Sequence, residues 1–371
     1  MIINSIIYIV RRLGNVLLGA VMLALAGGHI GAARAGGATH ENDLTVGSYA
    51  FIASDLAVIV NDADPVSVRI GQYYKARRHL PEGNVIHVRF TAGRSTMSRA
   101  EFQRVKIEVD KATPRHIQAY ALAWTQPYRV GCMSITTAIA MGFDSAFCSK
   151  SCAPTRPSPY FNSYSRRPYD DYGIRPAMML AGRDFQEVKE LIDRGVASDH
   201  TFPRGTGYLV STSDRARNVR AVFYPEIIER YMQSPFDIRL VRANFIQNRK
   251  NVLFYFTGVR RVARLDSNRF IPGAIADHLT SAGGVLLRDG GGQMSSLRWL
   301  EAGATASYGA VSEPCNFPEK FPQPEIVIDH YLHGDRLIEA YWKSVAWPGQ
   351  GVFIGEPLAA PFTPRRQNFQ H

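Results

Sequence analysis

Continuous apolar runs in the first third of the chain predict strands that are buried on both faces. The run LAVIVND at 56–62 is rich in β-branched residues, which is typical of an interior strand of a parallel sheet. Apolar residues at helical spacing follow it, at Val66, Ile70, Tyr73 and Tyr74. Two further strands are predicted at 84–90 and 117–124, and Ser98 and Glu101 form a capping box for the helix between them. The pattern therefore indicates a β-α-β-α-β unit.

The alternation of strands and helices resumes after residue 176. Short apolar segments predict strands at 177–182, 207–214, 238–244, 251–258 and 305–311. Helical periodicity predicts helices at 184–195, 218–232, 294–304, 324–334 and 336–345. Strands that alternate with helices over this length favour an α/β fold, with a mainly parallel sheet flanked by helices on both faces.

The pattern also divides the chain into segments. We expect a first α/β lobe at 54–128 and a second at 177–362, which carries the candidate site. Between them, residues 129–176 are rich in Cys, Tyr and Arg and have little periodicity, so we expect a loop excursion. Two interpretations of it stay open: a binding loop for a polar ligand such as a peptide or envelope glycan, or a disulfide-pinned cover over the sheet edge. A flexible N-terminal segment at 36–53 and a tail at 363–371 complete the division.

Residues 1–35 have the organisation of a secretory signal peptide. Arg11 and Arg12 precede a short apolar run, and the small residues Ala33 and Ala35 follow it, which predicts cleavage after Ala35. The apolar start MIINSIIYIV is unusual for such a peptide, and it leaves an uncleaved anchor or a misplaced start codon as alternatives. No later stretch is long enough to cross a membrane. We therefore expect an exported protein, periplasmic or secreted, without a stable membrane span after cleavage.

Composition and charge narrow the choice of partner. The hydrophobic content of 46% and the charged content of 20% are ordinary for a globular protein. The formal net charge is +11, but the Lys and Arg residues are scattered and form no basic stripe. We therefore interpret the charge as a generally basic surface and expect no nucleic-acid partner.

The four cysteines are expected to form disulfides, because disulfides persist in an oxidising compartment. Cys148 and Cys152 lie in the loop-like stretch CSKSCAP, where a local bridge is feasible, and Cys132 would then pair with Cys315. A zinc site is less favoured, since it usually needs tighter CxxC spacing and a second pair. We expect no metal and no cofactor.

Ligands of open parallel sheets gather at the carboxyl ends of the strands, and that rule selects the candidate residues. The candidates for catalysis are Asp277, His278, Thr280, Ser281 and Glu313. The candidates for substrate binding are Thr257, Arg260, Arg261, Gln293 and Asn316. The sequence contains no Walker loop, no GxGxxG after the first strand, no HExxH and no GxSxG, which excludes the commonest nucleotide, zinc-protease and serine-hydrolase sites.

The order of motifs from residue 54 to 359 resembles the caspase–hemoglobinase type of α/β fold, in particular the gingipain-like cysteine peptidases. The segments that carry this resemblance are IRPAMMLAGRDFQEVKELIDRG, NVLFYFTG, SLRWLEAGATASYGAV, HYLHGDRLIEAYW and FIGEPLAAPF. More closely, CMSITTAIAMGFD, GAIADHLTSAGG and AYWKSVAWPGQGVFIGEPLA resemble an uncharacterised family of exported bacterial proteins. That family is associated with genomes that encode exosortase, a membrane enzyme of protein sorting.

The chain departs from the peptidase pattern at both catalytic positions. Thr257 stands where the resemblance implies a general-base histidine, and IADHLTSAGG has no cysteine where it implies the nucleophile. Without a thiolate–imidazole pair that chemistry is lost. We therefore favour a non-enzymatic binding or accessory role in cell-envelope protein sorting or surface biology. The alternative is a peptidase-type hydrolase whose site is rebuilt around His278 and Ser281 or Thr280.

Overall fold

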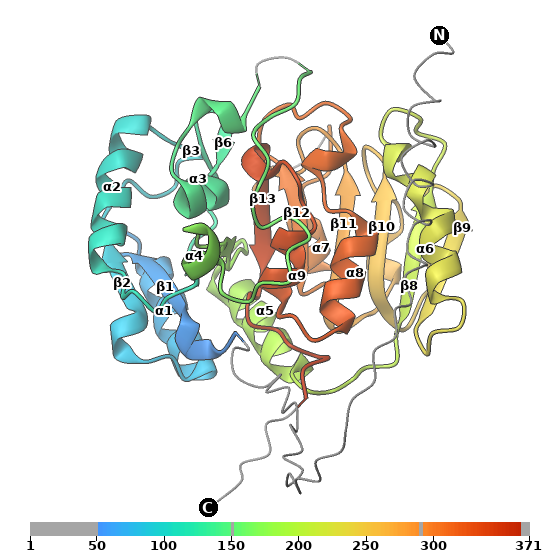
Figure 1. Cartoon of the computed structure of the whole chain (residues 1–371), viewed down its shortest axis with the longest axis horizontal. Helices are drawn as coiled ribbons and strands as arrows, with labels where there is room; N and C mark the ends of the chain where they lie inside the picture. Colours follow the sequence, from blue (N-terminus) through green and yellow to red (C-terminus); the bar gives the residue numbers. More distant parts are fainter. Residues whose placement is uncertain (1–50, 150–151, 289–291, 365–371) are drawn as a thin grey trace, which may run out of the picture. The chain divides into compact units, whose positions relative to one another are not determined.

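The computed structural model describes residues 51–149, 152–288 and 292–364. The expected signal peptide at 1–35 lies outside the described residues, as do most of the expected segment at 36–53 and most of the tail at 363–371. The described residues adopt an α/β fold built on one large, mostly parallel sheet with helices beside it (Figure 1), which confirms the expected fold class.

The large sheet has ten strands. In sheet order these are β2 (Val85–Val88), β1 (Leu56–Asn61), β4 (Ala119–Leu122), β7 (Ala177–Met179), β13 (Gly351–Gly355), β12 (Ala306–Ala310), β11 (Phe270–Leu279), β10 (Val252–Gly258), β8 (Thr206–Ser211) and β9 (Asp237–Arg242). A small second sheet consists of β3 (Thr96–Met97), β5 (Arg129–Val130) and β6 (Met133–Ser134). The helices are α1 (Pro65–Arg78), α2 (Arg99–Ala112), α3 (Ile135–Met141), α4 (Pro168–Tyr172), α5 (Phe185–Ser198), α6 (Tyr224–Tyr231), α7 (Leu297–Glu301), α8 (Pro324–Leu332) and α9 (Leu337–Lys343).

Strands from both predicted lobes belong to the large sheet. The lobes meet where β4 pairs with β7, over the register from Tyr120 and Ala177 to Leu122 and Met179. The pairs from β9 through β8, β10 and β11 to β12 are parallel, whereas β13 runs antiparallel to β12. Strand β13 was not predicted from the sequence. It lies between β12 and β7, so the last strand of the chain occupies the middle of the sheet.

Strand β1 shows how the sheet is buried. Its six residues are all buried, as its apolar run predicts. Successive side chains of a strand point to opposite faces. Leu56, Val58 and Val60 accordingly pack in one cluster with residues of α1 and α5, while Ala57 and Ile59 pack in another with residues of α2. Helices therefore cover both faces of the sheet at this strand.

The segment 129–176 contains short regular elements as well as loops. It begins with β5, β6 and α3, and α4 lies near its end. Between α3 and α4, the described residues of 152–167 form a strap without regular structure. Two backbone hydrogen bonds hold this strap against the end of α9 and the turn after it, from Ser158 to the carbonyl of Ala346 and from Asn162 to that of Lys343, both at 2.8 Å.

All four cysteines form disulfides, as expected, but the expected pairing is wrong. Cys132 pairs with Cys148 and Cys152 pairs with Cys315, with Cα separations of 6.0 and 5.5 Å. The chain reverses after α3, and the amide of Asp144 reaches the sulfur of Met133 at 3.3 Å. This reversal places Cys148 beside Cys132, so Cys152 is left to reach the loop after β12. Disulfides fit a protein that is exported to an oxidising compartment.

Within residues 51–149, 152–288 and 292–364, the structure contains no helix of the length and apolar character that a membrane crossing requires.

Candidate functional site

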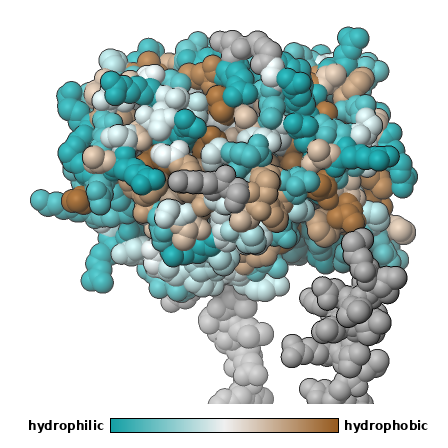
Figure 2. Space-filling view, turned by 90° about the horizontal axis from the view of Figure 1, so that it is seen from above, coloured by the Kyte–Doolittle hydropathy of each residue, from teal (hydrophilic) through white to brown (hydrophobic). Residues whose placement is uncertain are grey.

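The carboxyl ends of β8, β11 and β12 surround a hollow. Because these strands belong to one parallel run of the sheet, their ends lie at the same edge. Seen from above, hydrophilic and hydrophobic residues are interspersed over the face at which the strands end (Figure 2). The hollow has a volume of about 330 Å³, and its lining residues are Cys152, Ala216, Arg217, Leu279, Ser281, Glu313, Cys315 and Asn316.

Three of the predicted site residues therefore share this hollow: Ser281, Glu313 and Asn316. Ser281 follows the last residue of β11 by two positions, and Glu313 follows the last residue of β12 by three. The Cys152–Cys315 disulfide adds an apolar wall and ties the strap to the loop after β12. The strand-end rule thus identified residues that the fold brings together.

Arg217 is held in place by a polar network. Its guanidinium pairs with Asp214 at 3.1 Å and donates a hydrogen bond to the hydroxyl of Thr280, also at 3.1 Å. That hydroxyl donates in turn to Oε1 of Gln293 at 2.8 Å, and Gln293 also accepts from the amide of Ala282 at 2.6 Å. Thr280 and Gln293 therefore position the arginine at the wall of the hollow.

Glu313 is fixed by its own loop. Its carboxylate accepts from the amide of Cys315 at 2.8 Å, and its carbonyl accepts from the side-chain amide of Gln350 at 2.6 Å. Cys315 has a φ of 57°, a left-handed conformation that is uncommon for a residue other than glycine. The buried Lys320 donates to the oxygen of Gln350 at 2.9 Å, so the loop rests on a chain of hydrogen bonds.

His278 lies inside the core and not in the hollow. The indole of Trp299 donates to its Nδ1 at 2.9 Å, and its Nε2 lies 3.1 Å from the carbonyl of Met294. These partners define the neutral tautomer with the proton on Nε2. Burial lowers the pKa of His278 to about 3. Both ring nitrogens are therefore engaged, and neither is open to accept a proton from Thr280 or Ser281.

Asp277 faces away from His278, because neighbouring residues of a strand point to opposite faces. Its carboxylate pairs with the buried guanidinium of Arg220 at 2.6 Å and accepts from the hydroxyl of Tyr341 at 3.1 Å. Burial raises the pKa of Asp277, and Arg220 opposes that rise. Asp277 and His278 therefore make no acid–base pair with each other.

The remaining binding candidates lie apart from the hollow. Thr257 is fully buried, and its carbonyl accepts from Arg220 at 2.7 Å. Arg260 is exposed, and its carbonyl accepts from the amide of Met294 at 2.9 Å. Arg261 lines a different hollow, together with Arg264 and Arg298 among others. None of these three lines the hollow at the ends of β8, β11 and β12.

Arg217 and Ala216 were not predicted from the sequence as site residues. Both lie in the loop after β8, whose polar ending STSD was visible in the sequence. Applying the strand-end rule to that segment as well would have selected the loop in which both lie. No local pattern, however, indicates that Arg217 reaches Thr280, which is 63 residues further along the chain.

What the hollow offers is recognition of a polar ligand. It combines a fixed guanidinium, a hydroxyl and a carboxylate with the apolar surface of Leu279, Ala216 and the disulfide. Comparison of the chain with family models, curated proteins and solved structures finds no match.

Proposed function

We propose that this chain is an exported, caspase-like α/β protein that binds a peptide at the carboxyl edge of its sheet and does not hydrolyse it. In the cell it would act as a binding or accessory factor in envelope protein sorting or surface biology. The resemblance to the exported, exosortase-associated family supports this setting, and so do the two disulfides.

The observation that carries the proposal is the environment of His278. Hydrolysis by a serine or threonine hydroxyl needs a base within hydrogen-bond reach to accept its proton. The imidazole of His278 is instead held by Trp299 and Met294 in the core, and its low pKa keeps it neutral and weakly basic. The hollow therefore lacks a histidine base but contains polar groups that can bind a ligand.

A peptide suits the hollow because its groups match the lining. A guanidinium can donate to a peptide carbonyl or carboxylate, and a carboxylate can accept from a peptide N–H or a cationic side chain. Arg217 and Glu313 provide these two groups, and Leu279 and the disulfide provide contact for a small apolar side chain. We assign Ser281 and Asn316 to hydrogen bonding with the peptide backbone.

The test is retention of peptides by the purified protein. Exported proteins of the producing cell are digested, the pool is passed over the immobilised chain, and retained peptides are identified by mass spectrometry. We expect intact peptides to be retained and Arg217→Ala to weaken retention about tenfold, the loss typical of a charge-assisted hydrogen bond. The matched control is Arg215→Ala, since Arg215 is an exposed arginine two positions earlier that does not line the hollow. Equal retention of peptides by both variants would show that the hollow is not the peptide-binding site.

The alternative is a hydrolase, and one observation favours it: Ser281 and Glu313 line the same hollow. A carboxylate can serve as a general base when it reaches the nucleophile. The same peptide pool distinguishes the two functions. Peptides with new termini that disappear in Ser281→Ala support hydrolysis, whereas peptides of unchanged length support binding.

The cellular role is tested by deleting the gene and comparing the exported proteins by mass spectrometry. We expect particular envelope proteins to be mislocalised or unprocessed. Restoring the gene with Arg217→Ala should leave that defect in place, and restoring it with Arg215→Ala should repair it. An unchanged set of exported proteins would contradict a sorting role.

A further inference from the structure

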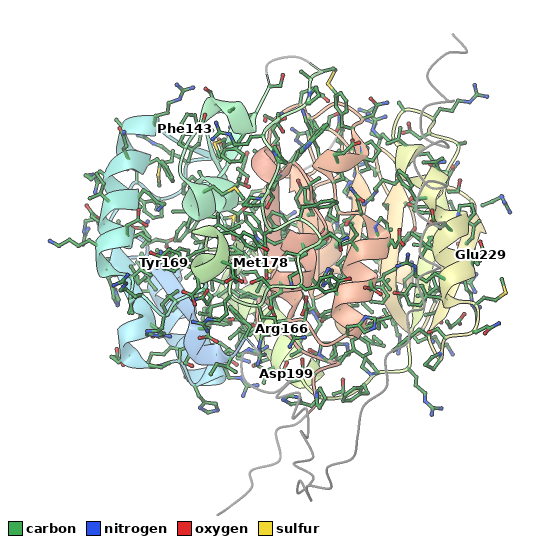
Figure 3. All side chains as sticks on the ribbon, viewed as in Figure 1. Phe143, Arg166, Tyr169, Met178, Asp199 and Glu229 are labelled. Carbon is green, nitrogen blue, oxygen red and sulfur yellow. A yellow bond between two sulfur atoms is a disulfide. The ribbon has the colours of Figure 1, made fainter. Side chains whose placement is uncertain are left out.

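Strand β9 presents an open edge. It is the last strand of the large sheet and pairs with β8 along its whole length, from Thr206 and Asp237 to Ser211 and Arg242, without a register shift. Within the described residues, no strand pairs with its other side. Figure 3 labels Glu229, which belongs to the neighbouring α6, on the side of the molecule where β9 lies.

The backbone groups on this edge can be assigned. The amide of Ala243 donates to the carbonyl of Ser211 at 3.1 Å, so Ala243 faces β8. Alternate residues of a strand direct their N–H and C=O groups to opposite sides. Val241 and Arg239 therefore face β8, and the outward groups belong to Ile238, Leu240 and Arg242. Unpaired groups of this kind form a ready template for another strand.

Strand β9 has only part of the protection that is usual for an exposed edge strand. Its sequence, DIRLVR, has charged residues at Asp237, Arg239 and Arg242, but it has no proline and pairs with β8 without a bulge. At the other end of the sheet, β2 has four residues, and the side chain of Arg104 donates to the carbonyl of Arg89 next to it at 3.1 Å. The β9 edge is thus the longer of the two, with six residues against four.

Another hollow lies at the amino end of β9. Its volume is about 650 Å³, and its lining residues include Phe202, Arg204, Phe236, Asp237 and Phe362. The ring of Phe362 makes edge contacts with those of Phe202 and Phe236, with centroids 6.3 and 5.6 Å apart. Phe202 is 54% exposed and has a φ of 46°, so a large apolar ring is held at the surface by an unfavourable backbone conformation.

The charges along this edge are mainly positive. Arg204 is an exposed residue at the hollow, and Arg242 is exposed at the far end of β9. Among the described residues, neither has a carboxylate within ion-pair distance, whereas Arg239 pairs with Asp237 at 2.6 Å. Two unpaired guanidinium groups therefore flank the edge, which suits a partner that carries carboxylates.

We propose that β9 binds an extended, acidic segment of another exported protein as an additional strand, with a large apolar side chain of that segment seated in the hollow of Phe202, Phe236 and Phe362. Main-chain hydrogen bonds to Ile238, Leu240 and Arg242 supply the pairing. The hollow selects the apolar side chain, and Arg204 and Arg242 select the acidic ones. This surface is distinct from the hollow at the ends of β8, β11 and β12.

The probe is a synthetic peptide of alternating Glu and Val with a Phe at one end, and its control replaces every Glu by Lys. Binding to the full chain is followed by hydrogen exchange of the backbone amides. We expect the Glu peptide to slow exchange at Ile238, Leu240 and Arg242 about tenfold. The Lys peptide should leave these amides unchanged. Equal protection by both peptides, or by neither, overturns the proposal.

Variants separate the backbone from the side chains. Arg242→Pro removes an outward N–H and leaves the bonds to β8 in place, so the peptide should no longer slow hydrogen exchange on β9. Arg242→Ala removes only the charge, so it should weaken peptide binding to a degree that depends on the salt concentration. Phe202→Ala should weaken binding of the Phe-ended peptide and leave a peptide without Phe unaffected. Arg217→Ala should change none of these results, which keeps this test independent of the proposed function. An unchanged unfolding temperature shows that each variant is folded.

Two further outcomes would assign the edge to another occupant. Protection of β9 that appears without peptide and grows with protein concentration means that a second copy occupies it. Protection without peptide that disappears when residues 36–50 are deleted means that the chain covers its own edge. Either result overturns the assignment to a separate exported partner.

Discussion

The indole of Trp299 donates a hydrogen bond to Nδ1 of His278 at 2.9 Å, in the interior of the protein. This contact makes Nδ1 an acceptor and leaves the ring proton on Nε2, which lies 3.1 Å from the carbonyl of Met294. A histidine at the end of a strand near two hydroxyl residues suggests a base when it is viewed in the sequence. In the fold it is a polar connection within an aromatic core.

The first prediction concerns the stability of the protein between pH 3 and 6.5. Burial lowers the pKa of His278 from 6.5 to about 3. The unfolded chain therefore binds a proton over this range and the folded chain does not, so the free energy of unfolding should fall as the pH is lowered. The slope should approach about 1.4 kcal/mol per pH unit for this one group. Thermal unfolding of the wild type and of His278→Asn, across this range, measures the difference.

His278→Asn keeps an acceptor for Trp299 and removes the titration. Its stability should therefore depend less on pH than that of the wild type. NMR titration of the ring protons of His278 provides the direct check. A midpoint near 6.5 would contradict the buried, neutral histidine.

The second prediction concerns the ion pair between Arg220 and Asp277, in which both side chains are 1% exposed. Removing one partner leaves an uncompensated buried charge, so Arg220→Met should lower the free energy of unfolding by about 3–5 kcal/mol. Denaturant unfolding at neutral pH measures this change. Arg215→Met, on an exposed arginine, should stay within about 0.5 kcal/mol of the wild type.

The third prediction concerns the disulfides. Peptide mapping of the unreduced protein should recover Cys132 linked to Cys148 and Cys152 linked to Cys315. Replacing Cys152 and Cys315 by Ser should lower the free energy of unfolding by about 2–4 kcal/mol and should also weaken peptide retention, since this pair lines the hollow. Replacing Cys132 and Cys148 should lower stability and leave retention intact. Recovery of a Cys148–Cys152 peptide would contradict the fold around the strap.

The fourth prediction concerns Glu339, which lies among buried charges. Burial and the neighbouring Asp335 raise the pKa of Glu339 to about 7, and Lys343 opposes them. A carboxyl with a raised pKa favours folding while it is protonated, so its contribution is complete below pH 4.5 and is lost as the pH rises towards 7. Glu339→Gln imitates the protonated form, and its stability relative to the wild type should therefore increase from pH 5 to pH 8. A constant difference across this range, in thermal unfolding, would contradict the raised pKa.

Much of the fold follows from local patterns in the sequence. The run at 56–62 predicted β1. Ser98 caps α2 as predicted, since its hydroxyl accepts from the amide of Glu101 at 3.1 Å, but the carboxylate of Glu101 accepts from the amide of Thr91 at 2.9 Å, so only half of the predicted capping box is present. Strand β13 was missed because its short apolar stretch, GVFIG, lies among glycines and a proline, and because it pairs with β12 in the antiparallel direction. Its pairing with β12 is set by contacts between distant segments.

The candidate site was less predictable than the fold. The strand-end rule selected Ser281, Glu313 and Asn316, which share a hollow, but it could not tell which strand-end residues turn inward. Neighbouring residues of a strand point to opposite faces, so the sequence alone already excludes Asp277 and His278 as an acid–base pair. The role of Arg217 depends on its contact with Thr280, and the disulfide pairing depends on the reversal after α3. Neither the contact nor the reversal can be recognised from a local sequence pattern.

The position of β13 has a consequence for how the chain matures. It joins β7 to β12, and both of those strands belong to the part of the chain enclosed by the link between Cys152 and Cys315. Until Gly351–Gly355 is available, the strands on either side of it have no shared neighbour. The two parts of the large sheet are therefore joined only when Gly351–Gly355 has paired with both neighbours, so the assembly of the sheet depends on a segment that follows both of them in the chain.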